Sequence, residues 1–194
     1  MMPRYSMLPV LALLAPGFLS TPVGAVAEGV IIRLSAVPVT AAEFKTFGQV
    51  VEASRAVRPT AENAVLSYWS GLARTQIHGD IEFGLMTVKS RDHVVAEMER
   101  HVKTPELLVS LRDDYLLVAA PPTPPRARRA FPDAAKTRVF LVARDQAVIL
   151  HKGTWHALPF PAGREGLFLV AFRAGTAKSD LKERPFRSGE IIRF

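Results

Sequence analysis

A chain of 194 residues, 48% hydrophobic and 22% charged, is long enough to bury the core of one globular domain and needs no second domain. It contains no cysteine, which excludes disulfides and thiolate catalysis and leaves His, Asp and Glu as the candidate metal ligands. The net charge is +7, but the basic residues are scattered and do not interleave with aromatic side chains, so nucleic acid is not expected as a partner.

The first 27 residues are expected to lie outside this domain, because they resemble a secretory leader. Arg4 is their only charged residue, residues 8–19 are almost wholly apolar, and Ala25-Val26-Ala27 has the small-x-small pattern of a signal-peptidase site. The apolar run is too short and too interrupted for a stable membrane span. We therefore expect a single domain over residues 28–194, periplasmic or secreted if the leader is real. The alternative is a misassigned start codon and a cytoplasmic protein that begins near Val30.

One short helix is predicted near the start of the domain. Thr40-Ala41-Ala42-Glu43 has the pattern of a capping box, Phe44 and Phe47 supply the buried side, and Gly48 is expected to end the helix. Short apolar or β-branched runs between turn formers follow, and these are typical of strands. The predicted strands are Val65 to Tyr68, Glu82 to Val88, Leu107 to Leu111, Tyr115 to Ala120, Val139 to Val142, Ala147 to Leu150 and Gly166 to Phe172.

Residues 121–137 interrupt this succession of strands. They contain five of the fifteen prolines and three arginines, so they cannot form an interior strand and are expected to be a surface loop that joins two halves. Many short strands with one short helix predict a mainly β domain, either a sandwich or a barrel.

The segment from Val94 to His101 fits two patterns. Val94, Val95 and Met98 satisfy a helical stripe, whereas a strand places Val95, Glu97, Glu99 and His101 on one face. In a strand, Glu99 and His101 point together into whatever the sheet encloses. In a helix, Glu97 pairs with His101 and Glu99 turns away. Helix propensity and the surrounding strands favour different answers.

Two distant segments carry the residue types that acid–base or metal chemistry needs. Glu99 and His101 are followed by Glu106, and much later His151-Lys152-Gly153-Thr154-Trp155-His156 sets two imidazoles around a glycine turn. This pattern predicts an enzyme pocket.

The order Glu99-x-His101, Glu106 and then Gly153-x-x-His156 resembles the two motifs of the cupin superfamily, in which histidines and a carboxylate converge inside a small β-barrel. Glu99 stands where the first cupin histidine is usual. The resemblance implies a cupin-like β-barrel or jelly roll with a short N-terminal helix.

More specifically, Met98-Glu99-Arg100-His101 and the segment His151 to His156 are similar to the paired motifs of the ureidoglycolate lyase family. The resemblance extends from about Ile32 to the arginine–glycine region at residues 173–175. The chain departs from the family pattern at Ala157, where a second histidine is usual, and at Phe172, where an aspartate is common.

The resemblance implies a carbon–nitrogen lyase that cleaves (S)-ureidoglycolate to glyoxylate and urea in allantoin and purine catabolism. Collapse of this carbinolamine needs a base for the hydroxyl proton and an acid for the departing urea nitrogen. The candidate catalytic residues are Glu99, His101, His151 and His156. Either His151 or His156 suits the acid or base role, because an imidazole titrates near about pH 6.5. Desolvation of Glu99 or Glu106 would raise the carboxyl pKa enough to share the role.

The substrate carboxylate needs a cation. Lys89 is the first candidate because it stands near a position where the family tends to have arginine, and Arg91 and Arg173 are the other candidates. Trp155 is expected to form an apolar wall that excludes water.

The implied reaction requires no cofactor, but the same positions are compatible with a divalent metal. Glu99, His101, Glu106 and His156 offer two imidazoles and two carboxylates, a set that suits zinc, manganese or iron. A metal-dependent oxygenase is a third interpretation.

Two further expectations concern function and assembly. The alternative to a lyase is a non-catalytic or differently specific cupin that binds a small carboxylate, which Ala157 and Phe172 favour. We expect a homodimer, because cupin barrels commonly cover exposed sheet edges by pairing.

Overall fold

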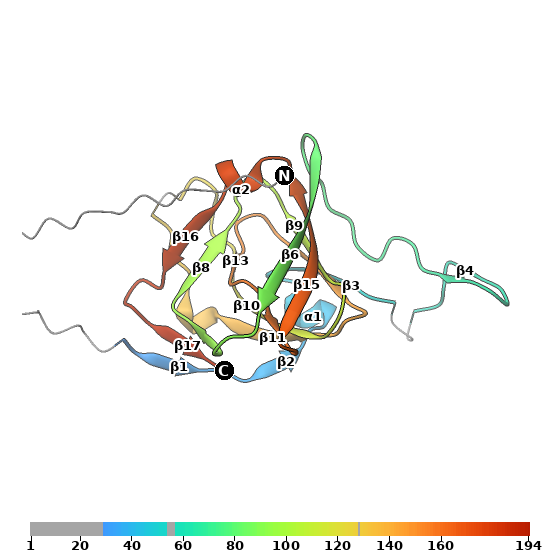
Figure 1. The fold of residues 1–194 in the computed structure, drawn as a ribbon. Helices are drawn as coiled ribbons and strands as arrows, with labels where there is room; N and C mark the ends of the chain where they lie inside the picture. The colour runs from blue at the N-terminus through green and yellow to red at the C-terminus, as the bar shows by residue number, and fades with distance from the viewer. Residues whose placement is uncertain (1–28, 54–56, 128) are drawn as a thin grey trace, which may run out of the picture.

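The fold was analysed in a computed structural model that describes residues 29–53, 57–127 and 129–194. The leader predicted over residues 1–27 lies outside the described residues. Strands dominate the domain, which confirms the mainly β prediction (Figure 1). No helix within the described ranges is both long and apolar enough to cross a membrane.

The larger sheet provides one wall of the domain. Its hydrogen-bonded order is β16-β8-β13-β10-β11-β2, and β14 also pairs with β10. The strands are β2 (Ala36–Pro38), β8 (Glu97–Arg100), β10 (Tyr115–Ala120), β11 (Arg138–Val142), β13 (Trp155–His156), β14 (Phe160–Pro161) and β16 (Lys182–Pro185).

The second wall is a five-stranded sheet in the order β3-β12-β9-β15-β6. Its longest members, β6 and β15, are paired over nine residues from Ile81↔Arg173 to Lys89↔Glu165. The strands are β3 (Gly48–Val51), β6 (Ile81–Lys89), β9 (Glu106–Ser110), β12 (Ala147–Leu150) and β15 (Glu165–Arg173).

Two smaller sheets and three short helical turns complete the described fold. The three-stranded sheet has the order β1-β17-β7, and β4 and β5 form a hairpin that projects from the domain in Figure 1. These elements are β1 (Ile31–Arg33), β4 (Ala61–Glu62), β5 (Ser67–Tyr68), β7 (Val94–Val95), β17 (Ile191–Arg193), α1 (Ala41–Phe44), the 3₁₀ turn η1 (Ala134–Lys136) and α2 (Thr176–Ser179).

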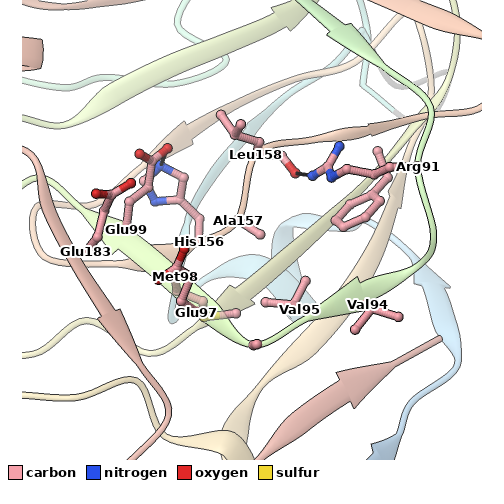
Figure 2. A pocket seen from close by; sticks show the side chains of 12 residues that line it. Arg91, Val94, Val95, Glu97, Met98, Glu99, His156, Ala157, Leu158 and Glu183 are labelled. Atoms are coloured by element: carbon pink, nitrogen blue, oxygen red, sulfur yellow. Dashed lines mark hydrogen bonds and ion pairs between the residues drawn. The ribbon is translucent and has the colours of Figure 1, made fainter. Parts of the chain in front are cut away.

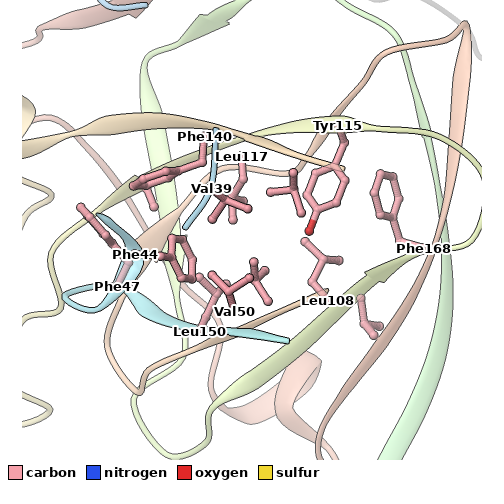
Figure 3. Packing of buried hydrophobic residues seen from close by; sticks show 14 of the residues in the cluster. Val39, Phe44, Phe47, Val50, Leu108, Tyr115, Leu117, Phe140, Leu150 and Phe168 are labelled. Atoms are coloured by element: carbon pink, nitrogen blue, oxygen red, sulfur yellow. The ribbon is translucent and has the colours of Figure 1, made fainter. Parts of the chain in front are cut away.

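The main core lies between the two large sheets. Leu117 and Phe140 of the larger sheet pack in one buried cluster with Leu108, Leu150 and Phe168 of the five-stranded sheet (Figure 3). Burying two apolar sheet faces against each other is the principal stabilisation available to such a domain. The result is the expected cupin-like arrangement, built from two separate sheets and not from one closed barrel.

The predicted helix is confirmed and starts as the capping pattern indicates. The hydroxyl oxygen of Thr40 accepts a hydrogen bond from the backbone N–H of Glu43 at 3.2 Å. The helix ends at Phe44, four residues before Gly48, and Gly48 instead begins β3. A Cβ at Gly48 would lie 2.2 Å from the Ile149 carbonyl oxygen, so glycine allows β3 to approach β12 closely.

The ambiguous segment from Val94 to His101 is extended, with a bend at Ala96 between β7 and β8. Tertiary pairing of β8 with β13 and β16 therefore overrides local helix propensity. The bend also breaks the simple alternation of the strand. Val95 packs in a second buried cluster with Met98, so the prediction that it shares a face with Glu99 is wrong.

The described residues between positions 121 and 137 contain no strand, as their prolines predicted. Part of this loop is packed and not merely solvated. Ala134 and Ala130 contact the second buried cluster, which also contains Trp155 and Phe186. The loop thus covers the outer face of the larger sheet.

Candidate functional site

The end of β8 and the start of β9 supply three of the candidate residues. Glu99 lies in β8, His101 follows that strand directly, and Glu106 begins β9. His101 and Glu106 are buried, whereas the side chain of Glu99 keeps 20% of its surface exposed. Of the two alternatives for this segment, the strand is the one found, and it directs Glu99 and His101 into the space between the two large sheets.

A glycine turn brings the fourth residue to the same place. Gly153 has a φ of +82°, and its N–H donates a 2.6 Å hydrogen bond to the carbonyl of His101. The chain then enters β13, where His156 is paired with Glu99 of β8 and with Ala119 of β10. Because Ala119 belongs to the main core, His156 faces the interior between the sheets.

The four side chains converge. His156 Nε2 lies 3.2 Å from Glu106 Oε2 and 3.4 Å from Glu99 Oε1. His101 Nε2 lies 3.3 Å from the same Glu106 oxygen. The structure therefore brings the two imidazoles and the two carboxylates together, as the sequence predicts.

Backbone carbonyls orient both imidazoles. His101 Nδ1 lies 3.1 Å from the Asp180 carbonyl oxygen, and His156 Nδ1 lies 3.2 Å from that of Thr154. A carbonyl only accepts, so each Nδ1 carries the hydrogen and each Nε2 is directed at the carboxylates. Thr154 is itself held by its hydroxyl, which donates to the Phe47 carbonyl at 2.8 Å.

Asp180 is a supporting residue that the motif analysis did not identify. Its side chain is fully buried and accepts hydrogen bonds from the N–H groups of Val102 at 3.2 Å and Lys103 at 2.7 Å. These contacts fix the turn that follows His101. Asp180 lies 79 positions away from His101 in the sequence and in neither motif, so no local pattern pointed to it.

The imidazoles and carboxylates of this cluster stabilise each other's charged forms. Burial alone would raise the pKa of Glu106, but the attraction of His156 and His101 lowers it to about 2. Burial alone would lower the pKa of His156, but Glu106 and Glu99 raise it to about 10. The pKa of His101 is also raised, because contact with Glu106 outweighs burial. The expectation of a raised pKa for Glu106 is therefore wrong, because the attraction of two imidazoles outweighs the effect of burial.

The cluster fits a divalent metal. Glu99, His101 and His156 offer ligand atoms that lie within 4.8 Å of one another. Glu106 Oε2 and His156 Nε2 are buried and make no well-aligned hydrogen bond with a group of the described residues, despite their short separation. Ligand atoms about 2.0–2.2 Å from a common ion would be separated by roughly 3.0–3.5 Å, and the three imidazole–carboxylate distances of 3.2–3.4 Å fall in this range. The orientation of both Nε2 atoms by carbonyls is also the usual support of a metal-binding histidine.

A pocket of about 330 Å³ opens beside Glu99 and His156. Figure 2 shows Arg91 at the other end of this pocket, with Ala157 and Leu158 between. The Arg91 guanidinium donates to the carbonyls of Leu158 at 2.6 Å and Pro159 at 2.9 Å, and it lies 3.6 Å from the Phe160 ring centre. Of the proposed carboxylate-binding residues, Arg91 is thus the one that lines the pocket.

Lys89 is not near this cluster. It is paired with Glu165 at one end of β15, whereas Phe172, whose ring is 5.9 Å from that of His101, lies near the other end. Phe172 lies seven positions beyond Glu165 along the strand, a distance of roughly 23 Å at about 3.3 Å per residue. The register of the long β6–β15 pair therefore separates Lys89 from the imidazoles.

Trp155 faces away from His156. It is fully buried in the second cluster on the outer side of the larger sheet, and its Nε1 donates to the Thr123 hydroxyl at 3.0 Å. Neighbouring residues of a strand point to opposite faces, so the tryptophan cannot line the same pocket as the histidine. The structure does not place Trp155 as the expected wall.

His151 and Arg173 also lie outside the cluster. His151 is half-buried at the end of β12, where its N–H donates to the Phe47 carbonyl, and it makes no ion pair with a described residue. Arg173 follows Phe172 in β15 and therefore points to the opposite sheet face. Its Nε is buried without a hydrogen-bond partner among the described residues.

Comparison with known proteins gives a consistent family result. The sequence model of the family described as ureidoglycolate lyase matches residues 31–193. Ureidoglycolate lyases of Burkholderia mallei strains NCTC 10229 and NCTC 10247 are each 27% identical over 152 residues, covering 75% of this chain and 85% of the relative.

Solved structures of two kinds are similar to part of this chain. An oxalate decarboxylase of Lactobacillus farciminis in complex with formate has a TM-score of 0.36 and 12% identity, over 55% of this chain and 27% of the decarboxylase. A dTDP-4-dehydrorhamnose 3,5-epimerase of Elizabethkingia anophelis NUHP1 has a TM-score of 0.38 and 10% identity, over 54% of each chain.

Proposed function

The chain belongs to the ureidoglycolate lyase family, and from that premise we propose that it cleaves (S)-ureidoglycolate to glyoxylate and urea. One observation carries the proposal: the Nε2 atom of His156 lies 3.2 and 3.4 Å from two carboxylates of different exposure. Such a set can both give and accept a proton within one small volume.

His156 is the proposed general acid. Its two carboxylate neighbours raise the pKa to about 10, so the imidazole carries a proton at Nε2 at neutral pH. In the reaction, the bond between the carbinol carbon and the urea nitrogen breaks, and its electron pair stays on nitrogen. That nitrogen takes the proton of His156 and leaves as urea.

Glu99 is the proposed general base. Its carboxylate keeps more exposed surface than that of Glu106 and lines the pocket, so it is open to a substrate hydroxyl. It takes the hydroxyl proton as the carbon–oxygen double bond of glyoxylate forms. Glu106, held between two imidazoles, remains ionised and keeps both of them oriented.

Arg91 is the proposed anchor of the substrate carboxylate. Two backbone carbonyls and the Phe160 ring hold its guanidinium at the pocket, so little side-chain freedom remains to be lost on binding.

Glu99, His101, Glu106 and His156 are the residues that would hold a divalent metal. When bound there, zinc, manganese or iron would supply a Lewis acid next to the carbinol oxygen. Holding an ion in this way requires His101 and His156 to be neutral, so metal and proton compete for their Nε2 atoms.

The second candidate function is binding of a different small carboxylate, with or without catalysis. The observation that favours it is Phe172, an aromatic ring packed 5.9 Å from the ring of His101. Ala157 also lines the pocket with a methyl group only. Ala157 thus makes the pocket less polar than the family pattern implies, and Phe172 puts an apolar ring beside His101.

We also propose a homodimer formed through the outer face of the five-stranded sheet. Both faces of β6 are apolar, and on the outer face Phe83 and Leu85 expose 67% and 70% of their surface. An antiparallel sheet normally presents polar residues on its wet face. The projecting β4–β5 hairpin adds exposed Val65 and Tyr68, so the chain carries two apolar surfaces that a second copy can cover.

The test of the lyase is release of urea and glyoxylate from (S)-ureidoglycolate by the purified protein. We expect turnover that falls about 10²-fold or more in His156→Ala and in Glu99→Gln, because each removes a proton-transfer group. His78→Gln, a histidine outside the cluster, is the matched control and should retain activity.

Metal analysis of the same preparations identifies any ion that they retain. Absence of turnover together with saturable binding of a carboxylate would contradict the lyase and support the second candidate. Full turnover in both cluster variants would overturn the proposed site.

A further inference from the structure

A second pocket lies on the other side of β8, between the larger sheet and the proline-rich loop. Its volume is about 370 Å³, within the range of small-molecule sites. Three basic residues line it, Arg100, Lys182 and Arg184, together with apolar groups of Trp155, Pro125 and Val102. We call it the cationic pocket.

Strand alternation explains why this pocket is basic while the first is acidic. In the β8–β16 pair, Lys182 is opposite Arg100, and Glu183 is opposite Glu99. Paired residues share a sheet face, and neighbours along a strand do not. The glutamates therefore line the first pocket, and the basic residues line the cationic pocket.

The positive charge of Arg100 is buried and makes no ion pair with a described residue, although the carboxylate of Asp180 attracts it from a longer distance. Only 4% of the residue is exposed, and its terminal nitrogens donate to the carbonyls of Thr123 and Ala127 and to the Thr123 hydroxyl. These acceptors are neutral, and the Nε hydrogen is buried without a partner among the residues that the structure describes. The guanidinium also lies 4.6 Å from the centre of the Trp155 ring, which orients it further.

The two exposed cations add to this charge. Lys182 and Arg184 make no ion pair with a described residue, and one Arg184 nitrogen donates to the backbone carbonyl of Glu183. Like charges held together in this way repel one another. An anion placed between them removes that repulsion and accepts charge-assisted hydrogen bonds.

We propose that the cationic pocket binds a small, multiply charged oxyanion, such as a phosphate or a dicarboxylate. Lys182 and Arg184 would donate to it directly, Arg100 would contribute its buried charge from below, and Trp155 would form an apolar floor. This site is separate from the proposed lyase site and does not depend on it.

The experiment is a titration of the full chain with inorganic phosphate and with malonate, at constant ionic strength set by sodium chloride. It is followed by calorimetry and by tryptophan fluorescence in a Trp69→Phe background, where Trp155 is the only remaining tryptophan. We expect saturable binding and a change in Trp155 emission.

The double variant Lys182→Gln/Arg184→Gln should weaken binding by about a hundredfold, because each lost charged contact is worth about tenfold. Lys45→Gln/Arg74→Gln removes two exposed cations elsewhere and should bind as the parent does. His156→Ala should also bind, which distinguishes this pocket from the first. Equal affinity in the two double variants, or no saturation by either anion, would overturn the proposal.

Discussion

Two backbone carbonyls decide how the imidazoles are presented. The carbonyls of Thr154 and Asp180 hold Nδ1 of His156 and His101, so that both Nε2 atoms face the carboxylates. Glu99 and Glu106 lie close to Nε2 of His156, but neither they nor another described residue makes a well-aligned hydrogen bond with it. That atom is therefore available to a substrate or an ion.

Asp180→Asn should destabilise the protein. The amide keeps the shape of the carboxylate, but its NH2 group faces one of the two N–H donors of Val102 and Lys103. A buried donor that loses its acceptor costs about 1–3 kcal/mol, which urea unfolding would measure. Asp133→Asn, at an exposed carboxylate that pairs with Lys136, is the control and should cost less. Equal losses would contradict the role assigned to Asp180.

At the scale of elements, the turn before β13 joins the two sequence motifs. Gly153 donates its N–H to His101, and a Cβ at Gly153 would lie 2.6 Å from the Thr123 carbonyl oxygen. Glycine is needed twice here, for the positive φ and for the space.

Gly153→Ala and Gly175→Ala separate these two requirements. Gly175 has a φ of +76° with no atom within 4 Å of an added Cβ, so alanine there meets only the backbone strain. Alanine at residue 153 meets the same strain and a clash with fixed backbone, and overpacking costs typically about 1–3 kcal/mol more. Thermal and urea unfolding of both variants would test this difference. A smaller loss at residue 153 than at residue 175 would contradict it.

Strand patterns also explain which parts of the site could be predicted. Glu99, His101 and His156 were singled out by their residue types and by the order of the two motifs, and strand alternation explains why the structure brings them together. Trp155 was assigned to the pocket because it belongs to the motif, although the same alternation directs it outward. Lys89 was misplaced because sequence spacing contains no information on the register of β6 with β15. Arg100 was passed over because its burial depends on a loop that folds back over the sheet.

At the scale of the whole molecule, the proposed dimer covers the exposed apolar residues on the outer face of the five-stranded sheet. Leu85→Lys should convert the proposed dimer to a monomer, because it places a charge beside the exposed Phe83 in the middle of the edge strand β6. Leu181→Lys, at a partly exposed leucine elsewhere, is the matched control and should leave the assembly unchanged. Sedimentation velocity would measure both. A parent protein that sediments as a monomer would contradict the dimer.

The unequal numbers of acidic and basic groups around the first pocket have a thermodynamic consequence. Glu97, Glu99 and Glu183 line it against the guanidinium of Arg91 and the imidazolium of His156, so a negatively charged guest enters an unfavourable field. A divalent cation would offset that field, and cation and guest should then strengthen each other's affinity reciprocally. Calorimetric titration of manganese with and without an unreactive carboxylate would reveal this linkage as two different dissociation constants, and identical constants would exclude it.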